Sequence, residues 1–362
     1  MITWFRREYA FIASVLTLIA FSIWGVDLLA QPFTPARAGL VFAWLFVVIL
    51  ASSFSVVRHA EWLAHRFGEP YGTLILTLSV ICIEVAMIAS VMVVGPDNPT
   101  LARDTMFAVL MLVMNGLIGI CLLIGGYFHR EQYFNLRSAG SYLALLLVLA
   151  TLGLILPTWT TSTTDASHSP MFAIFLGVAA FGIYGVFLGL QASTHKDYFV
   201  HGDEDDHAEG KLEGSAIYHG IMLVLTMIPI VLLAKKIAVV LQYGLDSSGL
   251  PMELGGVVVA ILVLSPEGLA ALGAARHNNL QRVMNISLGS ALATIGLTIP
   301  AVIAIGVITS EPVQLGLDPV DTILLLLTLG LCVVNFSGGR TNVLQGFIHL
   351  LVFAAWIVLI FD

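Results

Sequence analysis

The sequence predicts an all-α polytopic membrane protein with about 11 transmembrane helices, arranged as one N-terminal helix followed by two inverted five-helix repeats. Of its 362 residues, 58% are hydrophobic and 10% are charged, and the mean hydropathy is +0.97. Soluble domains carry about a quarter charged residues, so this composition places the chain in a bilayer. Glu84 and Glu267 each lie in the middle of an apolar run, one in each half of the chain, which indicates an internal repeat.

Apolar runs close to the roughly 20 residues needed to cross a bilayer recur along the whole chain. The first run follows Arg6 and Arg7 and exceeds the roughly 7–15 apolar residues of a secretory signal, so we expect a retained span. The expected spans lie near residues 9–29, 37–57, 72–94, 104–127, 140–156, 171–192, 216–234, 255–275, 284–308, 320–336 and 343–361.

These runs divide the chain into four segments. Residues 1–34 hold the N-terminal helix, 35–193 the first five-helix repeat, 194–214 an acidic cytoplasmic linker and 215–362 the second five-helix repeat. The matched cores of the two repeats lie near 72–120 and 255–300. Because each repeat holds an odd number of spans, the second repeat enters the membrane in the opposite sense to the first.

The basic residues orient the chain, since cytoplasmic loops of membrane proteins carry an excess of Lys and Arg. With the N-terminus in the cytoplasm, eleven of the 15 basic residues lie inside, and four lie outside: Arg37, Arg103, Lys235 and Lys236. The short loops favour an integral protein of a bacterial inner membrane.

Glu84 and Glu267 each follow a glycine, Gly72 and Gly255, by twelve residues. Twelve helical residues rise about 18 Å, a little beyond the middle of a hydrocarbon core of about 30 Å. Because the two spans run in opposite directions, we expect the two carboxylates to meet near the midplane. A carboxylate at this depth usually marks an ion or proton pathway, although a protonated glutamate can also serve as a simple helix contact.

Four residues near the glutamates are candidate supporting ligands for a cation. Ser265 precedes Pro266, which predicts a kinked or broken helix with exposed carbonyl groups. Asn115 is the main polar residue deep in the fourth span and aligns with Thr294 in the ninth, where Ser290 occupies the same helix face. Small hydroxyl residues also promote ordinary packing of membrane helices, which is the alternative interpretation.

The paired acids suit cation and proton exchange. Calcium takes six to eight oxygen ligands, of which two carboxylates supply up to four while neutralising its charge. An empty pair of acids in a low-dielectric setting favours protonation. We therefore predict a secondary antiporter that exports Ca2+ from the cytoplasm in exchange for H+ by alternating access. A Na+ or K+/H+ antiporter using the same site is the alternative.

Other function classes are disfavoured. An intramembrane hydrolase would need a nucleophile–base set or a metal cluster, and the sequence has no HExxH or GxSxG motif.

The acidity is concentrated in the linker, which lacks the glycine and distal glutamate of an EF-hand and does not indicate a nucleic-acid partner. Cys82, Cys121 and Cys332 lack metal or disulfide spacing and are interpreted as core residues. We expect no enzyme activity and no cofactor; the partners are Ca2+, H+ and the lipid bilayer.

Residues 59–88, the acidic linker and residues 264–300 resemble the ChaA-type calcium/proton antiporters of the cation/calcium exchanger superfamily. The resemblance implies eleven spans with two inverted repeats, in which Glu84 and Glu267 alternately bind cation and protons with ligands from neighbouring repeat helices. Members of this type are associated with calcium, sodium and potassium. Many superfamily members carry Asn three residues before each glutamate, where this chain has Ile81 and Leu264. Gly268 stands where vacuolar exchangers often have His.

Overall fold

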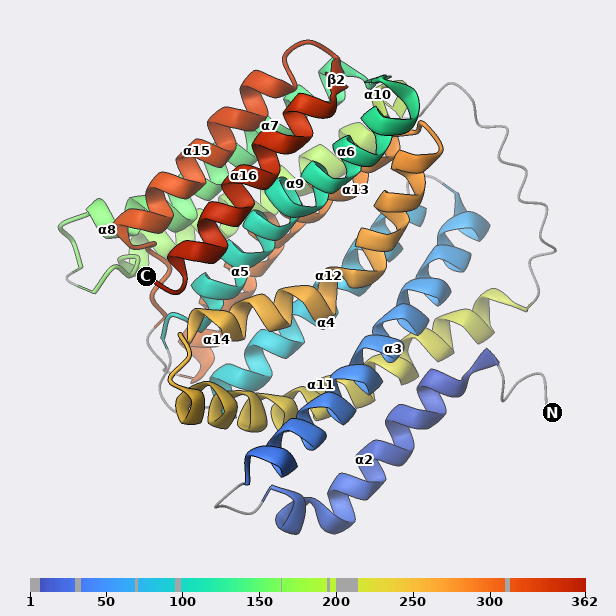
Figure 1. Cartoon of the computed structure of the whole chain (residues 1–362), viewed down its shortest axis with the longest axis vertical. Helices are drawn as coiled ribbons and strands as arrows, with labels where there is room; N and C mark the ends of the chain where they lie inside the picture. The colour runs from blue at the N-terminus through green and yellow to red at the C-terminus, as the bar shows by residue number, and fades with distance from the viewer. Residues whose placement is uncertain are drawn as a thin grey trace. The chain divides into compact units, whose positions relative to one another are not determined.

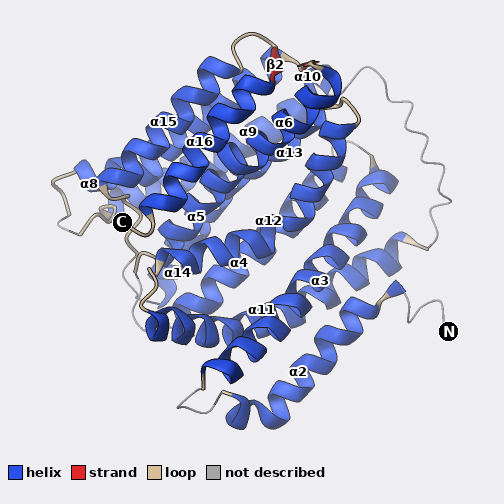
Figure 2. Cartoon of the chain, viewed as in Figure 1, coloured by secondary structure: helices blue, strands red, loops and turns tan. Residues whose placement is uncertain are grey.

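The structure of the chain is a computed structural model that describes residues 7–29, 34–68, 71–94, 99–163, 165–193, 196–199, 214–309 and 313–362. Helices make up nearly all of this part of the chain (Figure 2). In chain order the elements are α2 (Tyr9–Leu28), α3 (Pro35–Phe67), α4 (Tyr71–Val94), α5 (Leu101–Met111), η1 (Leu112–Leu117), α6 (Ile118–His129), β1 (Glu131–Tyr133), α7 (Leu136–Ala150), η2 (Thr151–Ile155), α8 (Leu156–Trp159), α9 (Pro170–Ala192), α10 (Lys196–Phe199), α11 (Ala216–Ser248), α12 (Glu253–Arg276), α13 (Leu280–Ala293), η3 (Thr294–Thr298), α14 (Ile299–Thr309), α15 (Pro319–Asn335), β2 (Arg340–Asn342) and α16 (Val343–Leu359).

Each expected span coincides with a helix or with a helix that contains one π-helical turn, such as η1. By length and apolar composition, seven helical runs could cross a membrane, and four shorter apolar helices accompany them in the part of the chain that the structure describes. The predicted all-α membrane fold is therefore confirmed.

Two helices are longer than the apolar runs predicted. α3 continues to Phe67, and α11 continues to Ser248 instead of ending near residue 234. Lys235 and Lys236 consequently lie inside α11 rather than between two helices, and their place on the outer side stays a prediction. A 33-residue helix can tilt in a bilayer, and lysine stems cover apolar surface while their amines reach water. Polar residues inside a long helix therefore do not mark its end.

Local capping signals set most helix starts. A Ser, Thr, Asn or Asp side chain accepts a hydrogen bond from a backbone N–H of the first turn, which satisfies a donor that has no partner within the helix. Proline follows the cap directly at three of these starts, where its fixed φ suits the first helical position. The capping residues are Thr34, Asn135, Ser169, Ser215, Asn279, Asp318 and Asn342.

Helices of the two halves match in length and in the position of a π-helical segment. α3 and α11 have 33 residues each, and α4 and α12 have 24 each. The next run in each half contains a π-helical segment at a similar depth, η1 in the first half and η3 in the second. These matches are what an internal repeat produces; the proposed boundaries of the repeats stay a prediction.

The chain divides into two compact units, which are not the repeats themselves. The first unit comprises residues 1–101 and 211–266, and the second comprises 102–210 and 267–362. Each unit therefore contains helices from both halves of the chain. Of the acidic linker at 194–214, the structure describes residues 196–199 and 214, and the acidic run itself lies outside the described residues.

In the first unit, α3 packs along α11 and also contacts α2 and α4 (Figure 1). Its core is aliphatic, with Leu45, Ile49 and Ile230 fully buried. Cys82 is exposed on α4, which corrects its interpretation as a core residue. Membrane helices carry apolar side chains on their lipid-facing surfaces as well, so an apolar run does not distinguish the two faces.

In the second unit, α16 packs closely against α6. A Cβ atom at Gly119 would lie 2.8 Å from a Leu350 side-chain carbon and 3.2 Å from the Gly346 carbonyl oxygen. Small residues at such contacts allow two membrane helices to approach and gain van der Waals contact. The antiparallel pair β1–β2 lies at one end of these helices, and Cys121 and Cys332 are buried in this unit as predicted.

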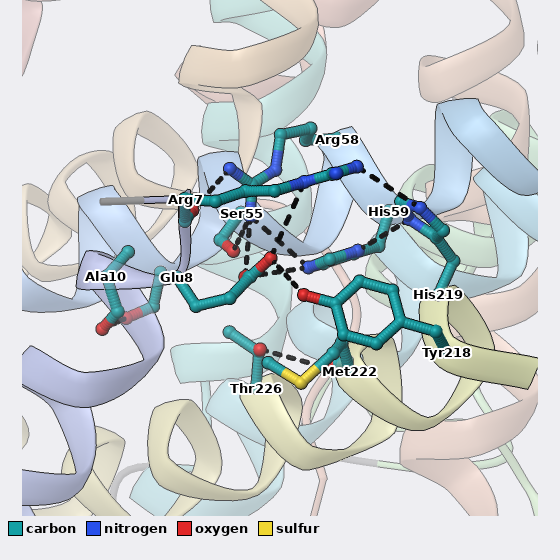
Figure 3. Close-up of polar contacts among 11 residues, drawn as sticks. Arg7, Glu8, Ala10, Ser55, Arg58, His59, Tyr218, His219, Met222 and Thr226 are labelled. Carbon is teal, nitrogen blue, oxygen red and sulfur yellow. Dashed lines mark hydrogen bonds and ion pairs between the residues drawn. The ribbon is translucent and has the colours of Figure 1, made fainter. Parts of the chain in front are cut away.

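A polar cluster joins α2, α3 and α11 in the first unit (Figure 3). The Glu8 cluster comprises Glu8, Arg58, His59, Tyr218 and His219. The Glu8 side chain is fully buried, and its Oε2 lies 2.7 Å from Arg58 Nη2 and 3.2 Å from His59 Nε2. The Tyr218 hydroxyl donates a hydrogen bond of 2.6 Å to Glu8 Oε1. One carboxylate thus holds the start of α2 against both long helices.

The surroundings of Glu8 stabilise its charged form. Burial by itself raises the pKa of this carboxyl, but the Tyr218 hydrogen bond and the nearby Arg58 and His59 outweigh it and hold the pKa below its ordinary value. A lowered carboxyl pKa adds stability above the unfolded-state pKa, and this stability is lost as the pH falls through the folded-state pKa.

Glu8→Gln preserves the size of this side chain and removes its charge. We expect the variant to unfold more easily at neutral pH, by about 1–3 kcal/mol, because hydrogen bonds to a charged group are lost within a buried site. The difference from wild type should shrink in acid, where wild-type Glu8 is itself protonated. Thermal unfolding in detergent at several pH values measures both effects. Glu61→Gln is the matched control, since no described hydrogen bond or ion pair involves Glu61; equal stability of Glu8→Gln and wild type at neutral pH would contradict the assignment.

Candidate functional site

Glu84 is buried in the first unit. It lies on α4 with 1% of its surface exposed, and its neighbours Ile83 and Met87 belong to the aliphatic core. Ile81, one turn earlier, is also buried and supplies no amide oxygen. A carboxylate in such a setting is costly unless a cation, a proton or hydrogen-bond donors compensate its charge.

Glu267 is the first residue of the second unit and lies on α12. The Ser290 side chain of α13 makes a hydrogen bond with its carboxyl group. The other oxygen, Oε2, is buried and has no hydrogen-bond partner among the described residues. The carboxyl group is thus only half satisfied. A buried oxygen of this kind is where a cation or a proton would be stabilising.

Hydroxyl groups line the neighbouring part of α13 and η3. Ser287 and Thr294 are fully buried, and Ser287 Oγ has no hydrogen-bond partner in the described part of the chain. Thr294 is the first residue of η3, and π-helical turns inside α-helices often occur at functional sites. Glu267, Ser290 and Thr294 therefore belong to one unit, and the roles of Ser290 and Thr294 as cation ligands stay predictions.

Asn115 lies within η1, and other helices already engage its amide. Its Nδ2 donates to Thr328 Oγ1 on α15 at 2.8 Å, and its Oδ1 lies 3.3 Å from His349 Nδ1 on α16. Asn115 and His349 are both fully buried. The structure thus places Asn115 in a network with α15 and α16, so its role as a cation ligand stays a prediction.

The Ser265 hydroxyl donates to the carbonyl oxygen of Ile261, one turn earlier in the same helix. Its role as a backbone or hydroxyl ligand stays a prediction. α12 is helical from Glu253 to Arg276 with Pro266 inside it, so the helix does not end at the proline. Pro266 has no N–H group, so the carbonyl group of Leu262 lacks its usual helical donor.

Polar groups outside the candidate site serve the fold. Gln345 completes a capping box at the start of α16, and His219 joins the Glu8 cluster. Sequence reasoning missed Glu8, although an acid at the edge of an apolar run facing an Arg58–His59 pair is a signal for such a cluster. Among the described residues, no group of three or more His, Cys, Asp or Glu side chains could hold a metal ion.

Comparison with known proteins identifies the family. Residues 37–192 and 218–361 match the family described as sodium/calcium exchanger protein. The chain is 41% identical over 362 residues to the sodium-potassium/proton antiporter ChaA of Escherichia coli, covering 98% of this chain and 97% of the relative. It is 24% identical over 254 residues to a Ca(2+)/H(+) antiporter of Aphanothece halophytica, covering 66% of each chain.

The fold agrees with these matches. The solved structure of native YfkE superimposes with a TM-score of 0.74 at 17% sequence identity, covering 97% of this chain and 99% of that one. These relatives are exchangers rather than enzymes, so the hydrolase alternative is excluded. The two matched segments, the similarity to ChaA along nearly the whole chain and the shared fold show that the protein belongs to the sodium/calcium exchanger family and exchanges cations for protons across a membrane.

Proposed function

We propose that the protein exports Ca2+ in exchange for H+, with Glu84 and Glu267 as the residues that bind the cation or protons in turn. The observation that carries this proposal is the half-satisfied carboxyl group of Glu267, whose buried Oε2 has no partner among the described residues. Glu84, its counterpart in the first half, is also buried. Their sequence positions, each twelve residues after a glycine, support a shared site.

The chemistry of two carboxylates suits a divalent cation. Together they neutralise the charge of Ca2+ and supply up to four of the six to eight oxygens it requires. Ser290 supplies a further oxygen beside Glu267, and backbone carbonyls and water would complete the shell. Once the cation leaves, two like charges in an apolar setting are unfavourable, and taking up protons relieves the repulsion. The site would therefore alternate between cation and protons.

Alternating access is the proposed mode of exchange. Rigid-body movement of one helix group is the usual basis of alternating access in transporters built from repeats, so the site would open to one side of the membrane at a time.

Na+ or K+ is a second candidate for the exchanged cation, and the similarity to ChaA favours it. That relative, at 41% identity, is a sodium-potassium/proton antiporter, whereas the Ca(2+)/H(+) antiporter is 24% identical. Ile81 and Leu264 are both buried and apolar, so they supply no amide oxygen one turn before either glutamate. Fewer fixed oxygens weaken the advantage of Ca2+ over a monovalent ion.

We place the protein in a bacterial inner membrane with its N-terminus in the cytoplasm. The helical fold and the match to an Escherichia coli antiporter support this location. Four basic residues, Arg37, Arg103, Lys235 and Lys236, would then lie on the outer side, against eleven on the cytoplasmic side. This bias towards the cytoplasm supports the proposed orientation.

Glu84→Gln and Glu267→Gln should each abolish exchange, because a neutral amide can neither compensate a cation nor release a proton. The measurement is cation-driven proton movement in proteoliposomes containing a pH-sensitive dye. Glu253→Gln is the matched control, since Glu253 is an exposed residue in the first turn of α12. The control should retain wild-type exchange. Wild-type rates in either of the other two variants would rule out the paired site.

Adding Ca2+, Na+ and K+ separately to the same proteoliposomes distinguishes the two candidate cargoes. Calcium export predicts proton movement with Ca2+ at concentrations where Na+ and K+ give little. If the cargo is monovalent, Na+ or K+ should drive proton movement at concentrations where Ca2+ gives little. An ionophore that collapses the proton gradient provides the baseline. Proton movement with none of the three ions would contradict both candidates.

Ser290→Ala tests the hydroxyl beside Glu267. We expect the apparent cation affinity to fall by about tenfold or more, because a hydrogen bond to a charged group contributes about 1.5–3 kcal/mol. Ser265→Ala removes a hydroxyl group two residues before Glu267 in the chain. It should leave the cation affinity unchanged, since that hydroxyl donates to the Ile261 carbonyl oxygen of its own helix. Equal effects of the two substitutions on the concentration dependence of exchange would refute the specific role of Ser290.

A further inference from the structure

The two histidines of the Glu8 cluster touch each other across α3 and α11. His59 Nδ1 and His219 Nδ1 lie 2.9 Å apart, and the two residues are 0% and 1% exposed. The His219 ring also stacks on Trp62, with centroids 4.1 Å apart and planes inclined by 4°. Its Nε2 lies 3.3 Å from Arg7 Nη2, just before α2 (Figure 3).

These contacts favour one arrangement of the ring protons, in which Arg58 Nη2, although 3.3 Å from His59 Nε2, donates to Glu8 Oε2 at 2.7 Å. Arg7 can only donate, so His219 Nε2 is the acceptor and its proton is on Nδ1. His219 Nδ1–H then donates to His59 Nδ1, which leaves the His59 proton on Nε2, where it donates to the Glu8 carboxylate. The result is a directional chain from Arg7 through His219 and His59 to Glu8, with both histidines neutral. In the opposite pair of tautomers, His219 Nε2 would carry a proton and face the donor Arg7. His59 Nε2 would then be an acceptor and would face the acceptor oxygen of Glu8.

We propose that His219 Nε2 is a proton-binding site distinct from the glutamates, and that binding of a proton there weakens the attachment of Arg7 and so loosens the start of α2. A proton on Nε2 removes the acceptor that Arg7 uses and places a second positive charge 3.3 Å from it. The hydrogen bonds from His219 to His59 and from His59 to Glu8 keep their direction. Arg7 keeps its other contacts, since its Nε lies 3.8 Å from Glu8 Oε1, its guanidinium lies over the Tyr218 ring and its carbonyl oxygen accepts from Arg58 Nη1.

The added proton settles on His219 rather than on His59 for two reasons. The face of Trp62 attracts a cationic ring stacked on it, which favours a charged His219. His59 Nε2 already donates to the Glu8 carboxylate, so a second proton on His59 would have to bind Nδ1, the atom that accepts from His219. A proton on His59 would also point its Nδ1–H at the Nδ1–H of His219.

Charged and titratable groups face the pair from every element packed around it. Arg7 and Glu8 come from the start of α2, Arg58 from α3 and Tyr218 from α11. The Arg7 and Arg58 side chains are 33% and 39% exposed, so the cluster opens to solvent on their side. α2 itself precedes the family match, which starts at residue 37. The proton site therefore controls how α2 is attached to the family-matched part of the chain. This inference does not depend on the proposed function.

Tryptophan fluorescence of the purified full-length protein in detergent tests proton binding. A protonated imidazole stacked on Trp62 quenches its emission, so wild type should lose the Trp62 contribution on titration over about pH 8 to 4, around the ordinary histidine pKa. His219→Gln and Trp62→Phe should each lack this step. Arg7→Gln should keep the step and move its midpoint upward by about one pH unit, because a nearby positive charge is gone.

A spin label at Tyr9, an exposed residue beside the cluster, tests release of α2. The label should gain mobility over the same pH range in wild type and should show no transition in His219→Gln. If the His219 variant fails to fold, the Arg7 and Trp62 variants still decide the outcome. A fluorescence step that persists in His219→Gln, or an unchanged midpoint in Arg7→Gln, overturns the proton site. A fluorescence step with no change at Tyr9 overturns the release of α2.

Discussion

An acidic side chain enclosed by apolar membrane helices needs a cation, a proton or a full set of hydrogen-bond donors to compensate its charge. This constraint distinguishes the acids that bind ions from those that only stabilise the fold. Glu267 has one hydroxyl partner and one buried oxygen with none among the described residues. Glu84 is buried among aliphatic side chains. A structural role alone would be served at lower cost by glutamine. By contrast, Glu8 shows what a buried structural acid looks like, since Arg58, His59 and Tyr218 all contact its carboxylate.

The helices that carry the candidate ligands have features that recur in both halves of the chain. Long helices of equal length, α3 and α11, form the core of the first unit, and the helical runs that follow α4 and α12 each contain a π-helical segment, η1 and η3. Those segments carry Asn115 and Thr294, two of the candidate ligands. Close contact between α6 and α16 at Gly119 and Gly346 packs the second unit tightly. The helices that carry polar groups are thereby held by van der Waals packing, and the groups themselves remain available for chemistry.

Apolar runs predicted the long helices, because a bilayer demands long hydrophobic segments. They did not predict the ends of α3 and α11, since basic residues such as Lys235 can lie inside a tilted helix. Pro266 lies within α12 and does not end it, which the sequence alone could not distinguish from a break. The candidate ligands were identified by depth and spacing, whereas Thr328 beside Asn115 and Tyr218 beside Glu8 lie more than 200 residues away along the chain, so the folded structure was required to find these contacts.

The central claim is that Glu84 and Glu267 form one ion site and not two. Equilibrium binding of radiolabelled Ca2+ and Na+ to the purified protein tests it most directly, because stoichiometry is independent of transport. A shared site predicts one high-affinity ion per chain in wild type and none in either single glutamine variant. Two ions per chain in wild type, with one retained in each variant, would contradict it.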